Sequence, residues 1–131
     1  MKKIFNLVLT SVLFCLMALP LQAAEPYDLQ KFQEAQKNGE RIVLQFQADW
    51  CPVCQKQKPN LEALQSELDK NKIRLMTVIF DKEKQLVQKM NVPSPSTLVA
   101  FIGNTEVKKM PNQVTKEQLT DFMNTAFGGK K

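Results

Sequence analysis

The sequence contains no histidine, only three cysteines and a single tryptophan. Without histidine, no imidazole is available as a general base or as a zinc ligand. The basic residues are interleaved with acidic ones and form no stripe with aromatic residues, so nucleic acid is not an expected partner. No internal repeat or low-complexity tract divides the 131 residues, and this length allows one domain with a core of moderate size.

Residues 1–24 are expected to be a cleaved signal peptide rather than part of that domain. Lys2 and Lys3 precede the mostly apolar segment Ile4–Leu19, and the small pair Ala23-Ala24 follows. A basic start, a short apolar stretch and small residues at its end are typical of a secretory signal. The stretch is shorter than the roughly 18–20 residues of a spanning helix, so an uncleaved membrane anchor is the less favoured alternative. Residues 25–131 would then be one periplasmic or secreted domain.

Cleavage would leave two of the three cysteines. Cys15 would leave with the signal peptide; a lipid attached to it is a further alternative, although the bulky Phe14 is not typical of a lipid-attachment site. Cys51 and Cys54 remain, spaced Cys-x-x-Cys, too close together to clamp distant parts of the fold. In an oxidising compartment, we expect this pair to be present for its own chemistry.

The cysteines lie where a strand is expected to give way to a helix. The apolar run Ile42-Val43-Leu44 predicts a buried strand, and the leucines at 61, 64 and 68 have the spacing of one helix face. Cys51 would cap this helix, with Pro52 as its first residue, where a missing N–H costs nothing. The free N–H groups and the helix dipole would favour a nucleophilic thiolate at Cys51. By itself, Cys-x-x-Cys also matches half of a zinc site.

The sequence Trp50-Cys51-Pro52-Val53-Cys54 after a hydrophobic strand, with Pro59 further along the helix, resembles the active site of the thioredoxin family. The resemblance covers roughly residues 28–128. It implies an α/β thioredoxin-like fold and a redox-active Cys51–Cys54 disulfide, with no metal and no further cofactor. It also implies that Cys51 attacks, that Cys54 resolves the mixed disulfide, and that Pro59 kinks the helix, as an interior proline does.

The apolar spacing predicts alternating helices and strands. Helices are expected over Asp28–Asn38, Pro52–Lys70, Glu83–Met90 and from the capping box Thr115/Gln118 to Gly128. Strands are expected over Arg41–Gln47, Ile73–Phe80, Thr97–Ile102 and Glu106–Met110. Inward-facing residues of the first and last helices are expected to be Leu29, Phe32, Ala35, Leu119, Phe122, Met123 and Ala126. This order predicts a mixed sheet with helices on both faces. The resemblance implies that the usual first strand is shortened or missing.

A second informative stretch runs from Val92 to Phe101. In thioredoxins, a cis-proline followed by threonine lies opposite the dithiol and binds the extended substrate chain. Counting without gaps places Ser96 at that position, with Pro95 one residue early. Either Pro95 is the cis-proline, or Ser96 replaces it with a trans bond, because a non-proline cis bond costs about 2.5–4 kcal/mol. A third interpretation is that two prolines merely rigidify a turn.

Substrate docking is predicted to use residues from both stretches. These are Trp50, Pro52, Val53, Ser94, Pro95, Ser96 and Thr97. Trp50 is expected to shield one side of the dithiol. Pro52 and Val53 tune the helix N-terminus and therefore the redox poise, and Val53 offers only its backbone N–H. Lys56 and Lys58 could favour the thiolate, but a solvated helix face is the favoured interpretation.

The resemblance also identifies a departure in proton handling. The family places a buried aspartate, often with a lysine, where it assists deprotonation of the resolving cysteine. Gln45 and Thr77 occupy the matching positions here, and Gln45 cannot take a proton. Transfer at Cys54 would use water, the substrate thiol or a carboxylate such as Asp49, although we expect Asp49 to be solvated.

These residues support three hypotheses about function. The favoured one is a thiol:disulfide oxidoreductase that acts on protein thiols and disulfides, preferably as a reductase, with a membrane electron donor or acceptor. The second is a metal or iron–sulfur module shared by two chains, because two thiolates can hold a soft metal. The third is a chaperone or binding module with a vestigial dithiol. Under the favoured hypothesis we expect a monomer.

Overall fold

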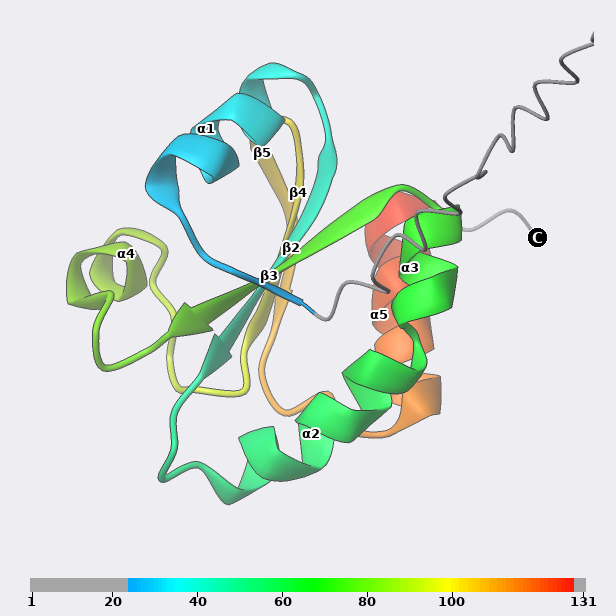
Figure 1. The fold of residues 1–131 in the computed structure, drawn as a ribbon. Helices are drawn as coiled ribbons and strands as arrows, with labels where there is room; N and C mark the ends of the chain where they lie inside the picture. The colour runs from blue at the N-terminus through cyan, green and yellow to red at the C-terminus, as the bar shows by residue number, and fades with distance from the viewer. Residues whose placement is uncertain (1–23, 129–131) are drawn as a thin grey trace, which may run out of the picture.

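The structure of the chain, a computed structural model, describes residues 24–128 (Figure 1). Its strands are β1 (Glu25–Pro26), β2 (Arg41–Gln47), β3 (Ile73–Ile79), β4 (Leu98–Ile102) and β5 (Thr105–Met110). Its helices are α1 (Leu29–Lys37), α2 (Pro52–Ala63), α3 (Gln65–Lys70), α4 (Lys84–Lys89) and α5 (Lys116–Phe127). Apart from Ala24, the expected signal peptide lies outside the described residues.

The sheet has the strand order β1-β3-β2-β4-β5. β3 pairs in parallel with β1 and β2, whereas β2 with β4 and β4 with β5 pair antiparallel. Because β2 and β4 run in opposite directions, the end of β2 and the beginning of β4 lie at the same edge of the sheet. The cysteines follow β2, and the segment 94–97 precedes β4. The topology therefore brings the two informative stretches of the sequence together.

Helices cover both faces of the sheet, with α1 and α4 on one face and α2, α3 and α5 on the other (Figure 1). β2 contributes to both apolar clusters, because successive side chains of a strand point to opposite faces. Val43 packs with the cluster of α2 and α5, while Ile42 and Leu44 pack with that of α1. Gln45 falls on the Val43 face, beneath α2. The predicted mixed sheet with helices on both faces is confirmed.

The predicted helix ends are also largely confirmed. Asp28 caps α1, since its side chain accepts a hydrogen bond from the backbone N–H of Lys31. Thr115 and Gln118 form the capping box of α5, and Gly128 ends that helix with a φ of 66°. A left-handed residue at this place suits glycine, which has no Cβ to clash. The observed strand bounds agree with the predicted ones to within one residue.

Two details differ from the prediction. The helix expected to run from 52 to 70 is divided at Leu64, whose N–H bonds the carbonyl of Leu61 in a tighter turn. Both halves still bury leucines of the same apolar cluster, so the leucine spacing alone could not reveal the break. Leu29, predicted to face inward, is 56% exposed, because it is the first residue of α1. A short β1 is present before α1, which agrees with the expectation of a shortened or missing first strand.

β1 covers only part of the outer edge of β3. Its two residues align with Met76 and Thr77, so within residues 24–128 the beginning of β3 has a strand, β2, on its inner side only. Arg74 lies in this stretch and forms salt bridges with Glu25 and Glu40. The edge strand is thus tied to the sheet by charge as well as by its backbone.

Among the described residues, no helix combines the length and the apolar character needed to cross a membrane.

Candidate active site

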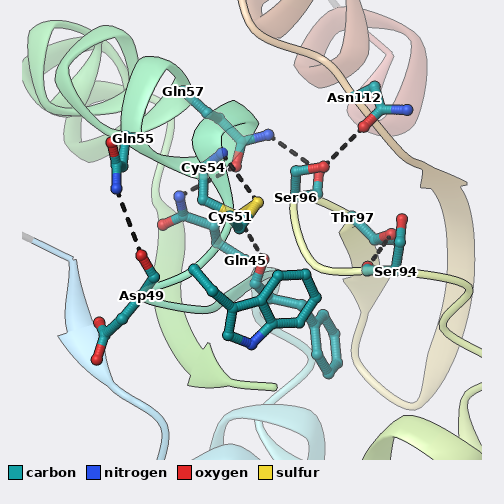
Figure 2. The surroundings of a disulfide bond; sticks show 12 residues. Gln45, Asp49, Cys51, Cys54, Gln55, Gln57, Ser94, Ser96, Thr97 and Asn112 are labelled. Carbon is teal, nitrogen blue, oxygen red and sulfur yellow. Dashed lines mark hydrogen bonds between the residues drawn. A yellow bond between two sulfur atoms is a disulfide. The ribbon is translucent and has the colours of Figure 1, made fainter. Parts of the chain in front are cut away.

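Cys51 and Cys54 lie at the beginning of α2 and are joined by a disulfide (Figure 2). Cys51 is the N-cap residue and Pro52 the first helical residue, as expected. The backbone N–H of Cys54 donates a hydrogen bond to Sγ of Cys51 at 3.1 Å. In the reduced protein this N–H and the helix dipole would favour a thiolate on Cys51. The groups that would stabilise a thiolate at Cys51 are therefore mainly backbone N–H groups of α2.

The disulfide is sheltered, since both cysteines are only 4% exposed. They form a small apolar cluster with Ala48, against which Val53 and Phe80 pack. Sγ of Cys54 lies 3.9 Å from the carbonyl oxygen of Phe46, which can accept a hydrogen bond from the reduced thiol. Cys51 is the more suitable nucleophile, because its sulfur receives the helical N–H.

Trp50, in contrast, is 62% exposed. Its indole Nε1–H donates a hydrogen bond of 2.8 Å to Oδ2 of Asp81, which follows β3. Pro52 is exposed and Val53 half-buried. Trp50 and Pro52 thus present accessible apolar surface immediately beside a sheltered disulfide.

The segment 94–97 continues the pairing of β4 with β2 beside the cysteines. The Ser96 N–H donates to the Phe46 carbonyl at 2.7 Å, and the Phe46 N–H donates to the Thr97 carbonyl at 3.0 Å. Thr97 Oγ1 donates to the carbonyl of Ser94 at 2.7 Å. No peptide bond in residues 24–128 is cis. Of the two functional alternatives, the one with Ser96 and a trans bond therefore describes the structure, whereas the one with Pro95 as cis-proline is wrong.

Ser96 adopts a φ of 69°, which residues with a Cβ rarely do. Its N–H, carbonyl and hydroxyl are all hydrogen-bonded, the hydroxyl to Oδ1 of Asn112 at 2.8 Å. A proline could not take this place, since it has no N–H and its ring fixes φ near −65°.

A buried pair of glutamines lies beneath the dithiol. Gln45 is 2% exposed and Gln57 is fully buried, and Gln45 Nε2 donates to Gln57 Oε1 at 3.1 Å. Gln57 is not among the site residues predicted from the sequence. It lies three residues after Cys54 and four before Leu61, on the buried face of the helix, so its spacing could have identified it.

Not all the residues considered for proton transfer lie together. Gln45 aligns with Thr77 on the neighbouring strand, so the two positions that match the family's aspartate and lysine are adjacent. A cavity of about 300 Å³ between α2 and the sheet is lined by both residues, a volume that admits water. Asp49 is exposed, and Figure 2 shows its carboxylate pointing away from the disulfide. Lys56 and Lys58 are exposed on α2.

A metal centre has little support in this arrangement. In the part of the chain that the structure describes, no three His, Cys, Asp or Glu side chains come together in a way that could hold an ion. The two thiols would need ligands from outside the chain to complete a closed site.

A family model described as Thioredoxin matches residues 24–125. The chain belongs to the thioredoxin family. It carries that family's thiol:disulfide oxidoreductase centre, a Cys-x-x-Cys pair at the start of a helix. The resemblance deduced from Trp50–Cys54 is thereby confirmed. The crystal structure of Trxlp from Edwardsiella tarda is 32% identical and superimposes with a TM-score of 0.70, covering 76% of this chain and 96% of that one.

Curated relatives include both short and long proteins. Thioredoxin of Alicyclobacillus acidocaldarius is 28% identical over 88 residues, covering 67% of this chain and 83% of its own. Probable protein disulfide-isomerase A6 of Medicago sativa is 28% identical over 127 residues, covering 94% of this chain. This chain spans only 35% of that relative and 16% of protein disulfide isomerase-like 1-4 of Arabidopsis thaliana.

Proposed function

We propose that this protein is an exported thiol:disulfide oxidoreductase that reduces disulfides in other proteins. The observation that carries the proposal is Cys51 at the start of α2, with its sulfur accepting the N–H of Cys54. This geometry stabilises negative charge on the sulfur that must attack. The exposed Trp50 beside it supports docking of a protein rather than a small thiol alone.

The reaction proceeds by two thiol–disulfide exchanges. The Cys51 thiolate attacks one sulfur of the substrate disulfide, a mixed disulfide forms, and the other substrate sulfur leaves as a thiolate that takes up a proton. The Cys54 thiol then loses its proton and attacks Sγ of Cys51. The second substrate thiol is released, and the Cys51–Cys54 disulfide remains. Two electrons have passed from the protein to its substrate.

Proton removal from Cys54 uses water in this proposal. Gln45 and Thr77 cannot serve as carboxylate and amine, and the cavity that they line gives water a place beside Gln45. The Asp49 carboxylate points away from the sulfurs, so we assign it no role.

The docking surface is formed by Trp50, Pro52 and Val53 on one side and by the half-buried Ser94 on the other, while the buried residues 95–97 hold Ser94 in place. These segments lie at the same edge of the sheet because β2 and β4 are antiparallel neighbours. A substrate lying between them would reach Cys51 from the exposed side of Trp50.

The proposal also includes export of the protein and the direction of electron transfer, from this protein to its substrate. The basic, apolar and small-residue pattern of residues 1–24 supports secretion. Mass spectrometry of protein from the periplasmic fraction should find a chain beginning after Ala23 or Ala24; an intact Met1 would refute cleavage. A periplasmic reductase must be re-reduced, and we assign this to a membrane electron donor.

The reduction potential of the Cys51–Cys54 pair tests the direction. It is measured by equilibration with glutathione, with the fluorescence of Trp50 as the signal. A value between about −230 and −270 mV supports a reductase. A value between about −120 and −180 mV would mark an oxidase or isomerase and overturn the proposed direction.

A further inference from the structure

Gln57 connects four parts of the chain through one buried side chain. From α2, its Nε2 donates to the carbonyl of Ser96 at 3.1 Å and to the carbonyl of Gln113 at 2.7 Å. Its Oε1 accepts from Gln45 of β2. Figure 2 shows the side chain pointing from the helix of the dithiol toward Ser96. The links to Ser96 and Gln113 span 39 and 56 residues of sequence.

The chemistry of this site requires a neutral primary amide. Two carbonyl oxygens need two N–H donors, and the Gln45 amide needs an acceptor. A glutamine side chain supplies both at one end. A glutamate would place a carboxylate against two carbonyl oxygens, and an apolar residue would leave both buried carbonyls short of a donor.

Ser96 is the residue that this amide holds. The left-handed backbone of Ser96 is disfavoured, so its orientation depends on the hydrogen bonds around it. Its N–H is bound to Phe46, while its carbonyl accepts from Gln57 and from the Asn112 N–H at 3.3 Å. Gln57 is one helical turn from Cys54 and therefore ties the segment 94–97 to the helix that carries the dithiol.

We propose that Gln57 is a positioning residue that holds the 94–97 segment in the orientation that docks protein substrates. The inference rests on the proposed function, in which this segment borders the bound substrate. Gln57 acts through Ser96 and touches neither sulfur in this role. Its loss should weaken docking of a protein disulfide while leaving the chemistry of the dithiol intact.

Asn60 provides a matched control on the same helix. Its Nδ2 donates to the carbonyl of Val114, the residue after Gln113, at 2.8 Å and to the carbonyl of Lys56, and not to Ser96. Gln57→Met and Asn60→Leu each remove an amide that ties α2 to the segment before α5. Only Gln57→Met also removes a hydrogen bond to the 94–97 segment.

The experiment compares KM and kcat for reduction of insulin disulfides with the rate of reaction toward the small disulfide DTNB. Gln57→Met removes all three hydrogen bonds of the side chain, one of them to Ser96, and should raise KM for insulin about five- to tenfold, a change equivalent to the loss of that one bond. Its kcat and its DTNB rate should stay within about twofold of the wild type. Asn60→Leu should leave all three values near those of the wild type.

Gln57→Glu gives a second readout that a merely structural role would not move. Its protonated carboxyl can donate one hydrogen bond, and burial raises the pKa of such a group. The increase in KM relative to the wild type should therefore be smaller at pH 5 than at pH 8, whereas that of Gln57→Met should not depend on pH. This variant keeps the shape of glutamine and replaces Gln57→Met in the comparison if the latter does not fold.

Each contrary outcome has a separate meaning. If Asn60→Leu raises KM as much as Gln57→Met, the effect is general loosening before α5 and the assignment to Gln57 is wrong. An equal loss of the DTNB rate would make Gln57 a residue of the dithiol rather than of docking. If the wild type itself shows no turnover of insulin, the proposed function fails, and this is distinguishable because no variant is needed to see it.

Discussion

Trp50 and Asp81 are joined by a hydrogen bond between the indole N–H and a carboxylate oxygen, although they follow different strands of the sheet. The bond fixes the direction of a ring that is largely exposed, immediately before the attacking cysteine. An exposed aromatic ring held in one orientation loses less conformational freedom when a partner binds. Asp81, in the loop after β3, thus contributes to the proposed docking surface through its bond to Trp50.

Replacement of Asp81 should therefore weaken substrate docking. Asp81→Ala removes the acceptor, and we expect KM for a protein disulfide to rise about two- to fivefold through the lost hydrogen bond. Asp81→Asn retains an oxygen acceptor and should behave nearly as the wild type. Steady-state insulin reduction gives KM, and fluorescence anisotropy of Trp50 reports the freedom of the ring. Equal KM values for all three proteins would show that the bond has no part in docking.

The roles of the two cysteines predict opposite trapping behaviour. Cys54→Ala should accumulate mixed disulfides with exported proteins, because Cys51 can still attack but nothing resolves the product. Cys51→Ala should accumulate none, since the sulfur of Cys54 lacks the helical N–H that would stabilise its thiolate. Non-reducing electrophoresis of both variants, expressed with residues 1–24, makes the comparison. Trapping by Cys51→Ala alone would reverse the assignment.

Ser96 gives a prediction about stability. Ser96→Pro removes the N–H that binds Phe46 and cannot adopt the observed φ, so it should lower the free energy of unfolding by about 2–4 kcal/mol. Ser96→Gly loses the hydroxyl bond to Asn112 but relieves the left-handed backbone, and these effects of about 1 kcal/mol each should nearly cancel. Urea unfolding measures both. A stable Ser96→Pro protein would mean that the family's usual proline fits this backbone.

Tyr27 is the only tyrosine, and its pKa is raised above the ordinary value of 10.0 by burial and by the charges of Glu83 and Asp28. Absorbance at 295 nm should therefore show its ionisation at a pH above 10.0 in the folded protein. A raised pKa means that Tyr27 contributes stability below pH 10, which is lost as the pH rises through the folded value. Tyr27→Phe should remove this part of the alkaline loss of stability. A midpoint at or below 10.0 would contradict the assignment.

Much of this molecule could be predicted from its sequence because the deciding signals are local. Strong apolar runs marked the strands, and side-chain caps such as Asp28 marked the helix ends. The place of the cysteines also follows locally, since Pro52 suits the first turn of a helix.

The remainder depends on contacts between distant parts of the chain. The choice between Pro95 and Ser96 required the hydrogen bond to Phe46, fifty residues earlier. Gln57 escaped notice because glutamine is usually exposed, and its partners at 96 and 113 come together only in the fold. The break at Leu64 leaves the apolar period unchanged and so has no sequence signal of its own.

The short β1 also affects how this protein behaves at high concentration. An uncovered strand edge offers its N–H and C=O groups to the edges of other molecules and so promotes aggregation. Here Arg74 lies in the uncovered part of β3, and its charge is held there by Glu25 and Glu40. We expect charged side chains at this part of the edge to disfavour the addition of a strand from a second chain.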